Sequence, residues 1–326
     1  ARVLGLAIAT QLQELLRALL HHGPVAVPLR VLQALPLGQV DFGHRVGDAC
    51  RELGIISLGP YPQHIGAALV DHRDLAGERV NGPVDVLLTK GDVPLYNVVV
   101  YVPNAPLDPL PEGASCDKCG STLSGKPLVS TITDTHGHFV LENMPVGKDI
   151  PLVIQVGKWR RQITIPSVAA CQDTPLGDPQ LTRLPKNGRE GDMPHIALTT
   201  GCDALECLLY GIGIDPTEFE AGNSNTGKHV HMFYGSGGST PKTVNGSNLP
   251  PAQDLWDNVA RMSAVDVTML ACECDEYAPG GTGTPNKPFG LPTMRNYANS
   301  GGKVFGTHYH YSWMKYNTAW SSGILD

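Results

Sequence analysis

The sequence predicts a multidomain β + α/β protein of 326 residues, and two observations carry the prediction. Between residues 82 and 166, short runs rich in Val, Ile and Thr are separated by Gly, Pro, Asn and Asp, which is typical of antiparallel strands joined by turns. Between residues 194 and 312, apolar runs alternate with segments of helical periodicity. That alternation is typical of a mostly parallel sheet with helices on both faces.

The chain is accordingly divided into four parts. Residues 1–80 contain seven arginines and no lysine, and we expect them to be an atypical, partly ordered leader or linker. Residues 82–166 form the predicted β domain, and residues 167–193 are a linker. Residues 194–326 form the α/β domain, which we expect to be truncated at its C-terminus.

Six strands are predicted in the β domain, and that number in so short a segment favours a β-sandwich. In the segment TDTHGHFVLENMPVG, Asp134 and Gly137 suit a tight turn, while Phe139 and Leu141 alternate onto one face. The residues from 105 to 127, which include Cys116 and Cys119, are predicted to be a loop inserted between strands. The six runs are VDVLLTK, NVVVYVP, LVSTITD, HFVLENM, IPLVIQVG and RQITIP.

The TD…G.F.L..MPVG pattern resembles the recurring hairpin of the carboxypeptidase regulatory-like (transthyretin-like) β-sandwich. The resemblance covers roughly residues 84–166. Such domains are usually non-catalytic accessories, so the resemblance implies a fold and carries little about activity.

The α/β domain is predicted to be a flavodoxin-like, mostly parallel sheet. In its second helix, Leu255, Val259 and Met262 fall on one stripe. The predicted strands are HIALTTG, HVHMFYG, VDVTMLAC and KVFGTH. The predicted helices are CDALECLLYGIGI, PPAQDLWDNVARMS and PFGLPTMRNYANSGG.

The phrase YANSGGKVFGTHYH, with DVTML…C before it, resembles the ThuA-like, class I glutamine-amidotransferase-like superfamily. The order of a sandwich, then KWRRQITIP, then this α/β domain resembles a group of uncharacterised secreted proteins of myxobacterial type. This second resemblance implies an extracellular or cell-envelope location. Eight cysteines also favour an oxidising compartment with some disulfides.

Ligands of open α/β sheets bind beyond the carboxyl ends of the strands. Those ends carry three groups of candidate residues, all of which could face one crevice. A thiol close to an imidazole is the minimum for nucleophilic catalysis by cysteine, so Cys272 with His308 or His310 is the candidate catalytic pair. The three groups are Thr199 with Thr200 and Gly201, Cys272 with Glu273 and Cys274, and His308 with His310.

The other residues at this edge receive supporting roles. Glu273 or Asp275 could orient the histidine, and the amides of Thr200 and Gly201, at the start of the next helix, could stabilise an oxyanion. Trp313, in the aromatic segment HYHYSW, belongs with Trp320 either to a platform for a sugar or peptide or to the edge of a core.

The sequence departs from the amidotransferase pattern around the candidate nucleophile. Class I amidotransferases place their cysteine in a G-x-C-x-G elbow, whereas Cys272 lies in L-A-C-E-C, and no H-x-E follows His308. The resemblance therefore carries no catalytic triad to this chain. The alternatives for Cys272 are a buried thiol or a disulfide to Cys202 or Cys274.

A metal site is a third hypothesis for the same edge. His308 and His310 form an H-x-H pair that could bind one ion, with Cys272, Glu273 or Asp275 as a further ligand. His229 and His231 begin another strand, so they lie at the opposite end of a parallel sheet and cannot share that ion.

Charge and composition limit the function classes. The net charge of −7 argues against nucleic acid as a partner, and no apolar run approaches the roughly 20 residues of a membrane span. The basic run Lys158–Gln162 is interpreted as a solvated face that pairs with acids downstream. No cofactor is indicated.

The sequence favours a secreted or envelope-associated binding or scaffold protein, with carbohydrate, peptide or another envelope protein as partner. The first alternative is a cysteine-dependent hydrolase or amidotransferase-like enzyme using Cys272 with His308 or His310. The second is a metal-dependent hydrolase at the same sheet edge.

Overall fold

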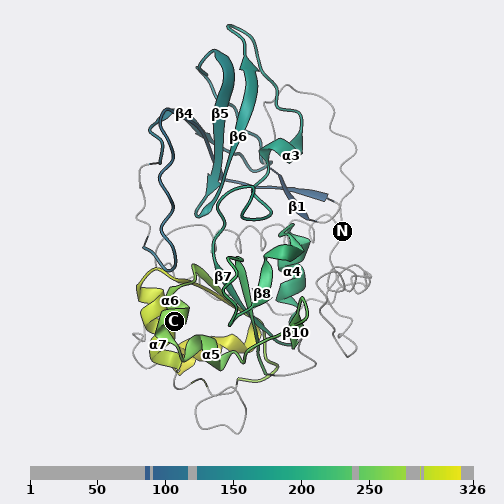
Figure 1. Ribbon diagram of the computed structural model, residues 1–326, viewed down its shortest axis with the longest axis vertical. Helices are drawn as coiled ribbons and strands as arrows, with labels where there is room; N and C mark the ends of the chain where they lie inside the picture. Colours follow the sequence, from purple (N-terminus) through teal and green to yellow (C-terminus); the bar gives the residue numbers. More distant parts are fainter. Residues whose placement is uncertain are drawn as a thin grey trace.

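The computed structural model describes residues 85–88, 91–116, 123–236, 242–276, 287 and 290–316. A domain of antiparallel strands is followed by a domain built on a parallel sheet (Figure 1), so the predicted β + α/β fold class is confirmed. The predicted leader, residues 1–80, lies outside the described residues. Within the described part of the chain, no helix is long and apolar enough to cross a membrane.

The β domain contains one four-stranded antiparallel sheet in the order β4-β3-β5-β6 and a separate two-stranded hairpin, β1-β2. Between β3 and β4, the described residues include no helix or strand, which agrees with the predicted inserted loop. The strands are β1 (Asp85–Leu88), β2 (Gly91–Pro94), β3 (Val99–Pro103), β4 (Pro127–Ile132), β5 (Gly147–Val156) and β6 (Trp159–Val168).

The turn after β4 forms as predicted, but the strand expected after it does not. The Gly137 amide donates to the Asp134 carbonyl oxygen over 3.1 Å, and Gly137 has the positive φ of 75° that favours glycine. Asp134 Oδ1 also accepts the amides of His136 and His138. The following run is irregular, although Phe139 and Leu141 pack into the same apolar cluster, as expected for residues on one face.

The α/β domain is built on five parallel strands in the order β13-β12-β7-β9-β8. Apart from the short edge strand β8, which the sequence analysis missed, this order reads 2-1-3-4 in chain sequence, as in flavodoxin-like sheets. After β7 the chain adds β9 on one side of β7, and later it adds β12 on the other side of β7. The switch point in strand order therefore lies between β7 and β12. The strands are β7 (Ile196–Thr200), β8 (Phe219–Ala221), β9 (Val230–Tyr234), β12 (Val267–Leu270) and β13 (Lys303–Gly306).

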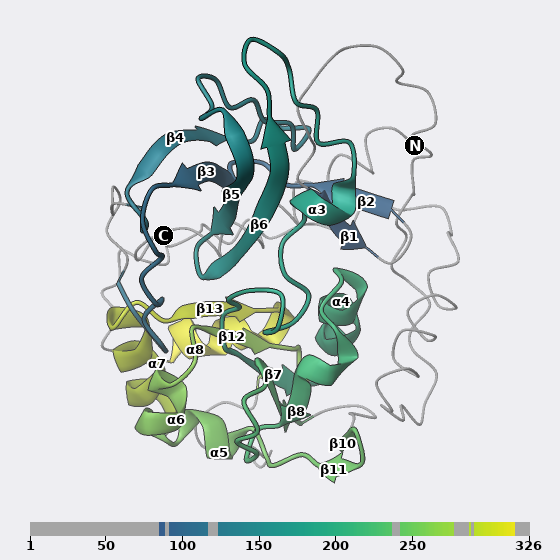
Figure 2. The same ribbon diagram turned by 45° about the horizontal axis from the view of Figure 1, so that its top comes forward.

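Helices cover both faces of this sheet (Figure 2), and alternate residues of β7 show how. Ile196 and Leu198 belong to the apolar cluster that includes residues of α4 and of the β domain. Ala197 belongs to a second cluster, which contains residues of α5, α6 and α7. These helices are α4 (Leu205–Gly211), α5 (Gln253–Trp256), α6 (Val259–Ser263) and α7 (Gly290–Asn299).

The remaining short elements are α3 (Pro179–Thr182), η1 (Pro216–Glu218), β10 (Thr243–Val244), β11 (Ser247–Asn248), η3 (His308–Tyr311) and α8 (Ser312–Lys315). The β10–β11 hairpin was also missed by the sequence analysis.

The single helix expected over residues 250–263 is instead two helices. The chain breaks at Asp257 and Asn258, and the Asn258 side chain caps α6 by accepting the Arg261 amide over 3.0 Å. The break rotates α6 relative to the expected stripe. Val259 is therefore 56% exposed, while Leu255 and Met262 are buried.

A buried ion pair joins the two domains. Lys158, in the turn between β5 and β6, pairs with Asp266, which immediately precedes β12, and the two side chains are 8% and 5% exposed. Asp266 Oδ2 also accepts the His195 amide over 2.7 Å. Arg160 is buried as well and pairs with Asp192. The predicted pairing of the basic run is thus confirmed, but Lys158 and Arg160 are not on a solvated face.

Candidate functional site

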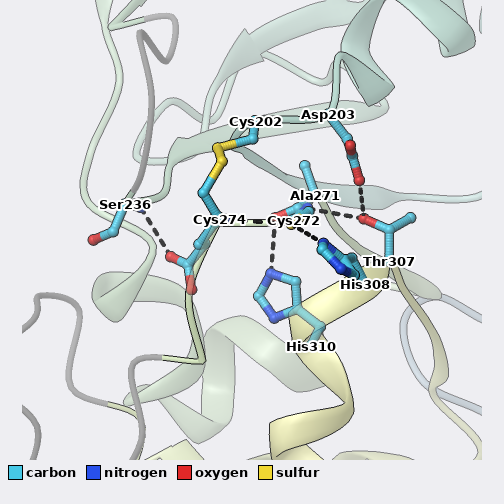
Figure 3. Close-up of a disulfide and its surroundings, with 10 residues drawn as sticks. Cys202, Asp203, Ser236, Ala271, Cys272, Cys274, Thr307, His308 and His310 are labelled. Atoms are coloured by element: carbon cyan, nitrogen blue, oxygen red, sulfur yellow. Dashed lines mark hydrogen bonds between the residues drawn. A yellow bond between two sulfur atoms is a disulfide. The ribbon is translucent and has the colours of Figure 1, made fainter. Parts of the chain in front are cut away.

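The candidate residues meet where β7, β12 and β13 end (Figure 3). Cys202 lies two residues beyond β7, Cys272 lies two residues beyond β12, and Thr307 and His308 follow β13 directly. The register pairs Thr199 of β7 with Leu270 of β12, so both chains leave the sheet side by side. This is the switch point in strand order, where open α/β sheets usually hold their ligands.

Cys272 and His308 form a thiol–imidazole pair. The Cys272 Sγ lies 3.1 Å from the His308 Nδ1, and the Cys274 amide donates to the same sulfur over 3.3 Å. Cys272 is a free cysteine and is 2% exposed, whereas His308 is exposed. His308 has a φ of 44°, a backbone conformation that a non-glycine residue rarely adopts. Strain of this kind gathers at sites where a side chain must be aimed.

Thr307 and Asp203 hold the backbone around this pair. The Thr307 Oγ1 accepts the Cys272 amide over 2.8 Å and donates to the Asp203 Oδ2 over 2.6 Å. The ends of β7, β12 and β13 are thereby connected through one hydroxyl group. Neither residue was predicted from the sequence, although Asp203 follows Cys202 directly and Thr307 precedes His308.

His310 has a different role from His308. Its Nε2 is 2.8 Å from the Ala271 carbonyl oxygen and therefore carries the proton, while its Nδ1 accepts the Trp313 indole N–H over 3.0 Å. Burial lowers the pKa of His310 to about 3, so the ring is neutral. Both nitrogens are committed to neighbours, which makes His308 the histidine that can exchange a proton with Cys272.

Trp313 lies in the core instead of on an exposed platform. It is 2% exposed and packs edge-on against Trp256, with ring centroids 5.1 Å apart. The other aromatic residue considered for the platform, Trp320, lies outside the described residues. Trp313 therefore supports the site by holding His310.

Glu273 is buried beside the site but points to other partners. Its Oε1 accepts the Ser236 amide over 2.9 Å, and its Oε2 pairs with the Lys287 ammonium over 2.6 Å. Burial raises the pKa of Glu273, and Lys287 opposes that shift. Asp275 is exposed. Among the described residues no carboxylate is hydrogen-bonded to His308, so neither acid orients the imidazole.

Thr200 and Gly201 bring the two strand ends together. The helix α4 begins only at Leu205, so these two residues do not lie at a helix start as expected. A Cβ on Gly201 would lie 2.2 Å from the Cys272 carbonyl oxygen, which means that only glycine permits this approach. Thr200 is buried, and its carbonyl oxygen accepts the Gly235 amide.

A disulfide joins Cys202 to Cys274 at the same edge of the sheet (Figure 3). The alternative that Cys272 itself forms a disulfide is therefore wrong for this structure. The premise behind it is confirmed, because β7 and β12 are neighbours and the Cys202 amide donates to the Cys272 carbonyl oxygen over 2.5 Å.

The described residues give little support to a metal site at this edge. In the described part of the chain, no three His, Cys, Asp or Glu side chains are grouped so that they could hold a metal ion. His310 would have to give up a hydrogen bond to Ala271 or Trp313 before it could bind one. As predicted, His229 and His231 lie at the opposite end of the sheet.

The chain was compared with protein-family models, curated proteins and solved structures, and none of the three comparisons found a match.

Proposed function

We propose that the protein is a cysteine-dependent hydrolase or amidotransferase-like enzyme, with Cys272 as nucleophile and His308 as its base. The observation that carries the proposal is the 3.1 Å contact between the free Cys272 Sγ and the His308 Nδ1. Nucleophile and base must lie within such reach for the proton to pass between them.

The reaction is transfer of an acyl group from a carboxylic ester or amide. The thiol proton passes from Cys272 to His308 Nδ1, and the thiolate attacks the carbonyl carbon. The leaving group departs with the proton from His308, and a thioester remains on Cys272. Water then hydrolyses the thioester, or an amine accepts the acyl group. Because Cys272 is buried and His308 exposed, the substrate approaches along the imidazole.

Cys274 stands where the second glycine of the G-x-C-x-G elbow would lie, and it has a positive φ of 64°. His308, which follows the neighbouring strand β13, also has a positive φ, of 44°. The Cys274 amide at 3.3 Å from the sulfur stabilises the thiolate.

The test uses a small activated ester, p-nitrophenyl acetate, with the thioester located by peptide mass mapping. We expect an acetylated Cys272 in the unaltered protein and none in Cys272→Ser. Cys171→Ser, which removes an exposed free thiol, is the matched control and keeps the adduct. Acetylation at the same rate in Cys272→Ser, or none at Cys272 in the unaltered protein, would contradict the proposal.

A binding or scaffold role in the cell envelope is the second candidate. The 2% exposure of Cys272 favours it, because a thiol with so little access also suits a structural position. The Cys202–Cys274 disulfide supports an extracellular or envelope location under either candidate. Carbohydrate, peptide or another envelope protein remain the proposed partners.

A further inference from the structure

Three cysteines of the α/β domain lie together at the switch point of the sheet. Cys202 and Cys274 form a disulfide, while Cys272 is free. Figure 3 shows the disulfide and the thiol–imidazole pair side by side. The proposed acyl transfer uses only Cys272 and His308, so the disulfide has no part in it.

The backbone brings Cys202 within reach of Cys272 as well as of Cys274. Continuing the β7–β12 register beyond the strands places Gly201 opposite Cys272, with Cys202 next in line. The Cys202 amide donates to the Cys272 carbonyl oxygen. Neighbouring strands are about 4.8 Å apart, and disulfides form at Cα separations of about 4.4–6.8 Å. The separation of the backbones therefore allows either pairing of Cys202.

The free thiol also contacts the backbone of one of the two bridged cysteines. The Cys272 Sγ is 3.3 Å from the amide nitrogen of Cys274, whose own sulfur forms the bridge. Exchange requires a thiolate, a disulfide within reach and a place for the proton. His308 Nδ1, at 3.1 Å from the Cys272 sulfur, supplies the last of these.

We propose that Cys272, Cys202 and Cys274 form a thiol–disulfide exchange site in which Cys202 changes partner. The Cys272 proton passes to His308 Nδ1, and the thiolate attacks the Cys202 Sγ. The Cys202–Cys272 bond forms as the Cys202–Cys274 bond breaks, and the Cys274 thiolate takes the proton from His308. The step is an isomerisation that consumes no oxidant or reductant.

The exchange has a consequence for the edge of the sheet. Cys274 is exposed and Cys272 is buried, so the reactive thiol moves from a buried position to the surface. In the exchanged form Cys272 is blocked, and the proposed acyl transfer stops. The inference rests on the same Cys272–His308 pair as the proposed function, but it needs no acyl substrate.

The test maps the cysteines of the unreduced protein over time. Samples held at mildly alkaline pH are alkylated with iodoacetamide, quenched in acid and digested at low pH, so that exchange stops before analysis. We expect alkylated Cys274 to accumulate together with a Cys202–Cys272 disulfide. Exposed Cys171 is the reference for reagent activity.

Two variants make the result specific. Cys272→Ser, a nearly isosteric change, lowers alkylation of Cys274 by about tenfold or more, because the attacking thiol is absent. His308→Gln slows the appearance of the Cys202–Cys272 disulfide by about tenfold. Cys171→Ser leaves both unchanged. Circular dichroism checks that each variant is folded.

The outcomes separate this inference from the proposed function. Cys272 that is acetylated by the ester while Cys274 stays unalkylated overturns the exchange and leaves the proposed function standing. Exchange without acetylation does the reverse. Alkylated Cys202 with a Cys272–Cys274 disulfide overturns the stated pairing, as does alkylation of Cys274 at an equal rate in Cys272→Ser.

Discussion

The two ends of the parallel sheet use similar residues for different purposes. At the amino end, His229 pairs with Glu218 over 2.5 Å and His231 with Glu220 over 3.1 Å. At the carboxyl end, His308 faces a thiol, and no carboxylate among the described residues bonds to it. A histidine held by a buried carboxylate fixes structure, whereas one that faces a free thiol can move a proton.

The amino end also anchors the β domain. Asp266 accepts the His195 amide and pairs with Lys158, and the His195 Nδ1 lies 3.1 Å from the His231 Nε2. Burial lowers the pKa of both His195 and His231. These groups have their partners within the fold, so a cluster of histidines is not by itself evidence of a catalytic or metal site.

The largest effect that we expect comes from a substitution at the amino end of the sheet. Lys158→Ala leaves the buried Asp266 carboxylate without its ammonium, and we expect the free energy of unfolding to fall by about 3–5 kcal/mol. Urea denaturation measures it. The matched control is Arg261→Ala, whose partly exposed pair with Asp254 spans 3.9 Å and should contribute less than about 1 kcal/mol. Equal losses in both variants would contradict the structural role.

Glu206, on α4, is a buried carboxyl group close to the carboxyl end of the sheet. It is 1% exposed, and within the described residues its Oε2 has no hydrogen-bond partner. Burial, assisted by Asp203, raises its pKa from 4.5 to about 7. As the pH rises, the Glu206 carboxyl ionises in the unfolded chain before it ionises in the folded protein. Its contribution to the free energy of unfolding is therefore fully present below about pH 4.5 and is lost as the pH rises to about 7.

The expected loss of unfolding free energy over that window is up to about 3 kcal/mol. Glu206→Gln, which does not ionise, should show a correspondingly flatter pH dependence in urea denaturation. A variant that follows the unaltered protein over the whole window would show that Glu206 is ionised in the folded state.

Replacing one histidine at each end of the sheet compares the two ends directly. His308→Gln removes the proton acceptor from Cys272, and we expect acetylation by p-nitrophenyl acetate to slow about 100-fold, or about 2.7 kcal/mol. His231→Gln disturbs the pair with Glu220 and should leave acetylation unchanged while lowering stability. Stopped-flow measurement of nitrophenolate release gives both rates. Equal slowing in the two variants would mean that the ends do not differ as described.

Asp203 should have the smallest effect, because it acts through Thr307. Asp203→Ala removes the acceptor of the Thr307 hydroxyl, which can turn to the Leu270 carbonyl oxygen at 3.3 Å. We expect acetylation to slow about fivefold, equivalent to one hydrogen bond of about 1 kcal/mol. Asp203→Asn keeps an acceptor oxygen and should restore most of the rate. A failure of Asn to restore it would argue against positioning through Thr307.

The sequence predicted four of the five parallel strands, because each of the four is an apolar run next to a helix signal. It also placed Cys272 and His308 at one edge, since parallel strands end together. It could not decide between His308 and His310, which differ only in contacts made across the sheet. It also could not tell which cysteine pairs with Cys202, because residues 272 and 274 differ by two positions along one chain.

Other misses have local causes. The strand β8 has three residues, which are too few to show a hydrophobic period. The helix break at Asn258 was missed because the apolar residues on both sides of it follow one helical pattern, although the Asn258 side chain caps a new helix. Trp313 carries no signal of burial in the sequence, since aromatic residues suit both platforms and cores. The prediction that Glu273 or Asp275 would orient the histidine rested on their position in the chain alone, and Glu273 instead binds Lys287.

The most direct test of the account is mass-mapped alkylation of Cys272 in the unreduced, folded protein, with Cys171 as the exposed reference. We predict that Cys272 is alkylated under native conditions despite its 2% exposure, because His308 accepts its proton. A Cys272 that stays a free but unlabelled thiol until the protein unfolds would contradict this prediction. That result would make the thiol structural and would leave the α/β domain a binding or scaffold module.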